Sequence, residues 1–275
     1  DSINGVLVKT KKKESDIDLI ISGDLQNQIA ASDYAIREFD IPFLGIYNAC
    51  ATYGEGLIIG SNFIDSKKYN NIVVSTSSHN MVSERQFRNP TEYGAPKPDY
   101  ATFTASGAVS TLLTNKKSKI KIVSSTIGKI MDAKIHDVNN MGAIMAIGAA
   151  DTIKRHLDNL NVGPDYYDLI LTGDLAKYGE KILIEYMKEF DIDLSKNYHD
   201  CGTMLYNLDE QPVFAGGSGP VCSALVTFGY ILKEMKNGTY KKVLYVPTGA
   251  IFSPTMFYQK ESIPTVSHAV SLERV

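Results

Sequence analysis

The residue in this sequence best suited to covalent chemistry is Cys50, which lies in the stretch GIYNACATYGEGL at positions 45–57. The apolar run from Phe43 to Tyr47 predicts a strand before it, and the stretch from Thr52 to Phe63 predicts a helix after it. A thiol at the start of a helix can have a lowered pKa, and the thiolate is the nucleophilic form of cysteine. The same pattern also fits a cysteine that is simply a small buried residue.

A second helix start with related features lies in AGGSGPVCSALVTFGYIL at positions 215–232. Gly216 and Gly217 predict a turn there, and Ser218 is suited to cap the helix that follows. Backbone N–H groups at a helix start bind anions. If the two helix starts face each other, Cys50 with Ala51 and Gly217 with Ser218 would line one anion-binding cleft.

Three pairs of similar segments recur in the same order along the chain. DLIISGDL at 18–25 matches DLILTGDL at 168–175, EFDI at 38–41 recurs at 189–192, and YNNIVVSTSS at 69–78 resembles YKKVLYVPTG at 240–249. Each copy has the pattern strand, helix, strand, which predicts parallel sheets with sites at the carboxyl ends of the strands. The sequence therefore predicts a duplicated α/β unit, with residues 1–118 as the first half and 119–275 as the second.

Composition limits the possible functions. A chain of 275 residues, 44% of them hydrophobic, can bury a large core, and its net charge of -3 gives no general attraction to nucleic acid. The 3 cysteines lack metal-ligand spacing, and their odd number favours a reducing compartment. The sequence shows neither a membrane-spanning apolar run nor a signal peptide. Because Asp1 opens onto what resembles the end of a helix, we expect that a preceding segment has been removed.

Several longer motifs resemble a single family over nearly the whole chain. They are SGDLQNQIAAS, IPFLGIYNACATYGEGL, STSSHNMVSERQFRNPTEYGAPKP, NNMGAIMA, YYDLILTGD, DCGTMLY and AGGSGPVCSA. Together they resemble the stage V sporulation protein AD family of the thiolase and ketoacyl synthase superfamily, without the family's N-terminal segment and first strand. The resemblance implies a thiolase-like α/β fold with two pseudo-symmetric halves, parallel-rich sheets and a layered αβαβα core.

Enzymes of this superfamily pair the cysteine with a histidine and an asparagine (or a second histidine) from the second half, so the resemblance places the nucleophile at Cys50. The histidine position falls at Gly173 and Asp174, and the asparagine position falls at Gly217. Loss of an acid–base group costs ~10²- to 10⁴-fold in rate. We therefore expect no enzymatic activity, and a pocket opposite Cys50 that is enlarged by the missing side chains.

The five histidines of the chain are the remaining possible partners of Cys50. We expect surface or core roles for His136, His156, His199 and His268. His79 follows directly after a first-half strand, and it is therefore kept as a candidate ligand-binding residue.

The resemblance also implies a ligand, dipicolinic acid, and a role in loading it into the developing spore. Dipicolinate is a flat ring with two carboxylates, which the N–H groups near Ala51 and Ser218 would receive. A helix end contributes only ~0.3–1 kcal/mol, so we also expect an arginine at the site. The candidates are Arg85 and Arg88 in SERQFRNPTEYGAPKP, with Lys97 nearby, although Arg85 could instead pair with Glu84 or Glu92.

No cofactor and no protein-bound metal are expected, because the chain has no dedicated calcium loop. Calcium would enter only with the dipicolinate that chelates it. The small oxygen cluster of Asp137, Asn139 and Asn140 is better explained as a turn.

Three functions remain open at this point. The first is a non-catalytic dipicolinic acid-binding protein, peripheral at the spore inner membrane, that acts beside other stage V sporulation membrane proteins. The second is a ketoacyl synthase III-like or thiolase-like acyltransferase that uses Cys50, and the third is a structural scaffold. We also expect a homodimer that pairs through the Phe43–Tyr47 strand, as thiolase-like folds usually do.

Overall fold

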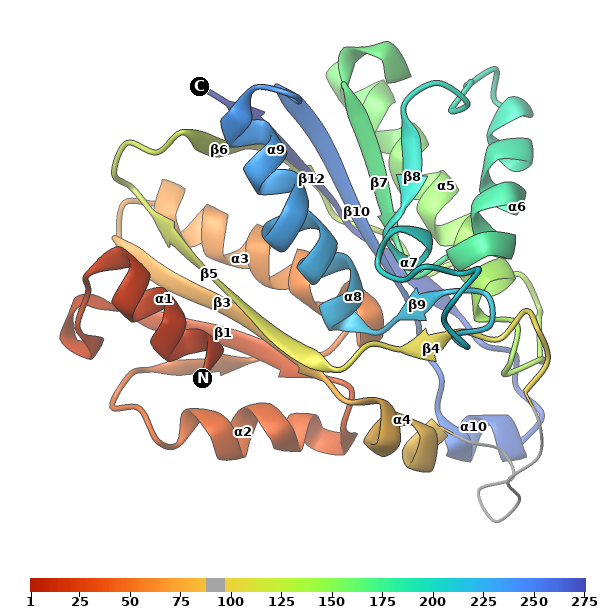
Figure 1. Ribbon diagram of the computed structural model, residues 1–275, viewed down its shortest axis with the longest axis horizontal. Coiled ribbons are helices and arrows are strands. Elements are labelled where there is room, and N and C mark those ends of the chain that lie inside the picture. Colours follow the sequence, from red (N-terminus) through yellow and green to blue (C-terminus); the bar gives the residue numbers. More distant parts are fainter. Residues whose placement is uncertain (88–96) are drawn as a thin grey trace.

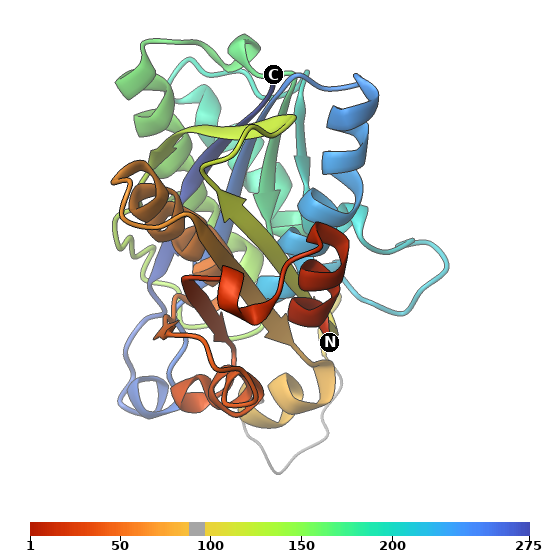
Figure 2. The ribbon, with the colours of Figure 1, turned by 90° about the vertical axis from the view of Figure 1, so that its left-hand side faces the viewer.

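The computed structural model describes residues 1–87 and 97–275 (Figure 1). It contains two large β-sheets with helices between them and on both outer faces. In Figure 2 the first half of the chain, red to yellow, lies in front of the second half, green to blue.

The first sheet has the strand order β2-β1-β3-β5. β1 pairs in parallel with both β2 and β3, and β3 pairs antiparallel with β5. The strands are β1 (Leu19–Asp24), β2 (Phe43–Gly45), β3 (Asn71–Ser78) and β5 (Gly107–Thr114). β2 is shorter than the predicted strand and lies at an edge of the sheet.

The second sheet has the order β6-β12-β10-β7-β8, with β11 also paired to β10. β7 is parallel to β8 and β10, whereas β12 is antiparallel to β10 and β6. The strands are β6 (Ile120–Thr126), β7 (Leu169–Gly173), β8 (Tyr198–Asp200), β10 (Lys242–Ala250), β11 (Thr265–Ser267) and β12 (Ala269–Arg274).

The path β2-β1-β3-β5 repeats as β8-β7-β10-β12 with the same pairing directions. β1 and β7 carry the two copies of the repeated GDL motif, which lie at corresponding places in the two sheets. The predicted duplication of a strand-helix-strand unit is thus present in the topology. Residue 118 as a domain boundary stays a prediction.

Five layers result from the alternation of side chains along the strands. Leu19 and Ile21 of β1, and Leu169 and Leu171 of β7, point into one shared core. The intervening Ile20 and Ile170 belong to two outer cores instead. Both faces of each sheet are therefore covered, which explains why these strands are apolar throughout.

Helices fill the layers on either side of the sheets (Figure 1). The central layer holds α3 (Thr52–Asp65) and the continuous segment of α8 (Pro220–Ala224), a π-helical stretch (Leu225–Ile231) and α9 (Leu232–Asn237). The outer layers hold α1 (Ser2–Thr10) with α2 (Ala30–Ile36), and α5 (Met141–Leu160) with α6 (Ala176–Lys188). The predicted αβαβα order is confirmed.

Short elements complete the end of the molecule where the site lies. They are α4 (Asn80–Phe87), β4 (Phe103–Thr104), α7 (Cys201–Met204), β9 (Gly217–Ser218) and α10 (Pro254–Tyr258). Asp137 forms the predicted turn, since its carboxylate accepts the N–H of Asn139 and its carbonyl oxygen accepts that of Asn140. Of the helices described, none is long and apolar enough to span a bilayer.

Candidate functional site

Cys50 lies in a 3-10 turn, Ala49–Ala51, that leads directly into α3. Ala49 begins the turn with a φ of 49°, a left-handed conformation that is uncommon for a residue with a side chain. β10 approaches this turn closely, because a Cβ added at Gly249 would lie 2.4 Å from the carbonyl oxygen of Asn48. A strand of the second half therefore fixes the turn that presents the first half's thiol.

Ser218 is the side chain of the second half that faces Cys50. Its Oγ atom lies 3.9 Å from the Sγ atom of Cys50. β9, which carries Ser218, is held in place by parallel pairing with β4 of the first half. Gly219 follows with a φ of 99° and turns the chain into α8. The two helix starts that the sequence singled out thus lie together.

Asp174 is the third polar side chain at this place. It follows β7, is fully buried and has a left-handed φ of 75°. Neither of its carboxylate oxygens has a partner with good hydrogen-bond geometry in the described parts of the chain, although the thiols of Cys50 and Cys222 lie close enough to lower its pKa. Burial, and after it the charge of Asp200, raises the pKa of this carboxyl well above its usual range. This shift favours the protonated form of Asp174.

Asp200 holds the turn that presents Asp174. Its carboxylate accepts hydrogen bonds from the hydroxyl of Thr172 at 2.7 Å and from the backbone N–H groups of Leu175 at 3.1 Å and Ala176 at 2.7 Å. Burial nevertheless raises the pKa of Asp200 to about 6. The turn is thus built around one carboxylate with many donors and presents a second carboxyl with none.

The Cys50 thiol is protonated in this environment. Burial, and after it the Asp174 carboxyl, raises the pKa of Cys50 well above its usual range, and hydrogen bonds from Ser218 and Gly219 offset only part of this. The lowered pKa that a helix start favours is therefore not found at Cys50. The thiols of Cys201 and Cys222 also have raised pKa values, again chiefly because of burial.

The space left by the two glycines is already occupied. A Cβ at Gly173 would lie 2.4 Å from the Cβ of Ser223, and one at Gly217 would lie 2.9 Å from the Sγ of Cys222. Neighbouring side chains therefore lie directly beside both glycines, and an enlarged pocket opposite Cys50 stays a prediction.

The remaining predicted residues are exposed, already engaged or outside the described parts of the chain. The N–H of Ala51 donates to the carbonyl oxygen of Asn48 at 2.9 Å and is not available to a ligand. His79 follows β3 and is exposed, as is Arg85 on α4. Arg88 lies outside the described residues. Lys97 forms an ion pair with Glu84.

Sequence reasoning missed the role of His268, which lies directly behind the Cys50 turn. Its Nδ1 atom accepts the N–H of Gly128 at 3.2 Å, so the ring proton is on Nε2. Nε2 lies 3.2 Å from the side-chain amide nitrogen of Asn48. Burial lowers the pKa of His268 to about 4. No local signal in the sequence marks this contact.

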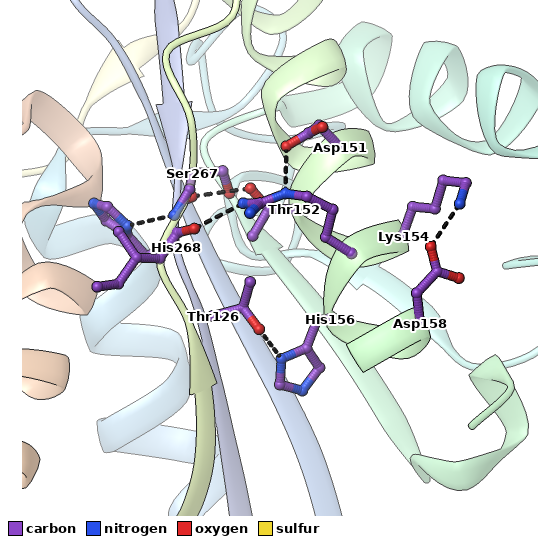
Figure 3. A network of polar contacts seen from close by, with 11 residues as sticks. Thr126, Asp151, Thr152, Lys154, His156, Asp158, Ser267 and His268 are labelled. Atoms are coloured by element: carbon purple, nitrogen blue, oxygen red, sulfur yellow. Dashed lines mark hydrogen bonds and ion pairs between the residues drawn. The ribbon is translucent and has the colours of Figure 1, made fainter. Parts of the chain in front are cut away.

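Helix α5 supports this segment from behind (Figure 3). Thr152 donates to the carbonyl oxygen of Ser267 at 3.0 Å, and His156 bonds Thr126 through Nδ1 at 2.8 Å. The other nitrogen of His156 lies 2.8 Å from the hydroxyl of Tyr167. His156 is a satisfied core residue, as expected, and α5 fixes the position of His268.

Comparisons with known proteins agree on a family and a fold. A sequence model described as Stage V sporulation protein AD matches residues 1–273. Stage V sporulation protein AD of Bacillus subtilis (strain 168) is 45% identical over 274 residues, which cover 100% of this chain and 81% of that protein.

Two solved structures show the fold alone, because their sequence identity is low. The tetronic acid condensing enzyme AbyA1 has a TM-score of 0.65 at 13% identity, covering 99% of this chain and 83% of that one. The 3-oxoacyl-[acyl-carrier-protein] synthase III of Aquifex aeolicus VF5 has a TM-score of 0.58 at 14% identity, covering 97% and 80%. The predicted thiolase-like fold is confirmed.

Proposed function

The chain belongs to the stage V sporulation protein AD family, and we propose that it is a non-catalytic binding protein of the sporulation machinery whose ligand is dipicolinic acid. It would serve the uptake of this acid into the developing spore. It would act at the inner membrane of the spore as a peripheral protein, beside stage V sporulation membrane proteins that move the ligand.

The observation that carries the non-catalytic part of this proposal is the environment of Cys50. A cysteine nucleophile needs a lowered pKa or an adjacent base, such as an imidazole. Burial raises the pKa of the Cys50 thiol, the Asp174 carboxyl raises it further, and the Ser218 hydroxyl and the Gly219 N–H offset only part of this. The nearby His268 is engaged with Asn48 and Gly128 instead.

The same environment supports the binding of an anion. Ser218 supplies a hydroxyl, and the backbone of Gly219 supplies an N–H, both directed at the thiol. Donors of this kind bind a carboxylate without a covalent step. Because water solvates a dianion strongly, the site also needs a positive charge to replace that solvation. Within the described residues, Arg85 on the exposed face of α4 remains the proposed source.

The competing function is an acyltransferase that uses Cys50 covalently. It is favoured by the fold, since the solved structures of similar fold include condensing enzymes. It predicts that acyl-CoA donors acylate Cys50, with a mass increase that Cys50→Ser abolishes. The binding function predicts no acylation.

Isothermal titration calorimetry with dipicolinate tests the proposal. We expect saturable binding, and we expect Cys50→Ser to weaken it by less than tenfold, because a thiol hydrogen bond contributes only about 1 kcal/mol. Cys50→Phe or Ser218→Leu should block binding by filling space. Cys201→Ser, which removes another buried thiol, is the control. A folded protein that does not bind dipicolinate would contradict the proposal.

A further inference from the structure

The two GDL motifs end in aspartates with opposite environments. Asp24 in the first copy accepts the N–H groups of Gln26 and Ser32, each at 2.7 Å. In the described parts of the chain, neither oxygen of Asp174 in the second copy has a partner with good hydrogen-bond geometry, and the groups that act on it there as weak donors are the thiols of Cys50 and Cys222. Both side chains are buried, with exposed fractions of 1% and 0%. Asp24 is buried because it accepts backbone N–H groups after its strand, and this reason does not apply to Asp174.

Holding Asp174 in this position costs stability. A left-handed φ is strained for a residue with a side chain, and a buried polar group without a partner adds a desolvation cost. Asp200 and its donors impose the turn regardless. An unsatisfied carboxyl kept in a strained backbone beside a thiol with 9% exposure is a feature that a ligand would explain.

Among the described residues, the titratable groups that interact with Asp174 are acids, thiols and a phenol. The groups that shift its pKa are Asp200, Cys50 and Cys222, and Asp174 in turn raises the pKa values of Cys201 and Tyr245. None of these five is a cation. An ionised Asp174 would repel a ligand carboxylate, because two buried carboxylates in contact do not both ionise.

We propose that Asp174 recognises one carboxylate of dipicolinate as a carboxylic acid, donating its O–H to the ligand beside Cys50. This inference rests on the proposed function. It assigns the orphan carboxyl a partner and makes a proton on Asp174 part of ligand recognition. The raised pKa of Asp174 supports it, since the shift favours the protonated form that can donate.

A matched pair of substitutions tests this role by calorimetry with dipicolinate. Asn and Gly both tolerate the left-handed backbone, but only Asn keeps a donor. We expect Asp174→Asn to bind within about threefold of the unmodified protein. Asp174→Gly should bind about ten- to a hundredfold more weakly, since a hydrogen bond to a charged group is lost. Thermal unfolding should show both variants at least as stable as the unmodified protein.

The pH dependence adds a second readout. Above about pH 6, where both ligand carboxyls are ionised, the affinity of the unmodified protein relative to Asp174→Asn should stay level or fall as the pH rises. Glu180→Gln, which alters a half-buried carboxyl bonded to Thr203, is the control.

Three results would overturn the inference. They are normal binding by Asp174→Gly, a loss of affinity in Asp174→Asn as large as that in Asp174→Gly, and an affinity of the unmodified protein relative to Asp174→Asn that rises with pH. If the unmodified protein does not bind dipicolinate, the proposed function fails first.

Discussion

The Sγ atom of Cys50 and the Oγ atom of Ser218 lie 3.9 Å apart, although 168 positions separate them in the chain. Cys50 follows a strand of the first sheet, and Ser218 is part of β9, which pairs with β4. The site exists only where both halves are folded against each other. Its chemistry is therefore a property of the duplicated fold rather than of either copy.

This contact leads to a prediction about thiol reactivity. Because burial and Asp174 raise the pKa of Cys50, iodoacetamide should alkylate Cys50 more slowly than free cysteine at pH 7.5. Cys201 and Cys222, with no exposed surface, should react more slowly still. Mass spectrometry of peptides from the folded protein measures the three rates. Alkylation of Cys50 faster than free cysteine would contradict the prediction and favour the acyltransferase function.

The fold could be predicted well because the apolar pattern of each strand is local and the strand-turn motif occurs twice. Buried runs such as Leu19–Asp24 and Leu169–Gly173 end in the same GDL motif, so two copies of one pattern report the same strand and turn. The layers follow from which side chains alternate along each strand.

The details of the site depend on tertiary contacts that no spacing reveals. Sequence reasoning identified Gly173 and Gly217 but could not show that Ser223 and Cys222 fill the space beside them. Asp174 and Asp24 have the same motif, and only the packed structure shows that Asp24 accepts two backbone N–H groups whereas Asp174 has no such donor among the described residues.

The edge strand β2 leads to a prediction about assembly. Leu44 is 37% exposed on this strand, which is the open edge of the first sheet. An exposed apolar edge favours pairing, so we predict a homodimer at micromolar concentration, and Leu44→Lys should shift it towards monomer. Val8→Lys, at an exposed position on α1, is the control. Sedimentation of the unmodified protein as a monomer would contradict the prediction.

His156 leads to a prediction about acid stability. Burial lowers its pKa to about 4 in the folded protein, against a usual 6.5. Below about pH 6.5 the unfolded chain takes up a proton that the folded protein does not, so the free energy of unfolding falls as the pH drops towards 4, by at most about 1.4 kcal/mol per pH unit for this residue. His268 acts in the same direction, and Asp200, with a raised pKa, acts in the opposite one.

A substitution isolates the contribution of His156. His156→Gln should lower the free energy of unfolding at pH 7.5 by about 1–3 kcal/mol, because hydrogen bonds to Thr126 and Tyr167 are lost or weakened. The difference from the unmodified protein should narrow as the pH falls to 4.5. Urea unfolding at each pH measures this difference. If the free energies of unfolding of the two proteins change in parallel with pH, His156 does not cause the pH dependence. His199→Gln, at an exposed position on β8, should have little effect.

The contact between Gly173 and Ser223 leads to the last prediction. A Cβ at position 173 would lie 2.4 Å from the Cβ of Ser223, so Gly173→Ala should destabilise the protein by about 1–3 kcal/mol through overpacking. Ser223→Gly removes the opposing Cβ but also its hydroxyl, which lies 2.9 Å from that of Tyr245, and it adds a glycine to α8. Both single variants should therefore be less stable, while the double variant should be more stable than the sum of the two losses predicts. A double-mutant cycle by urea unfolding measures this coupling. Additive losses would mean that the chain relaxes around position 173 in another way, and the close contact would not explain the glycine at this position.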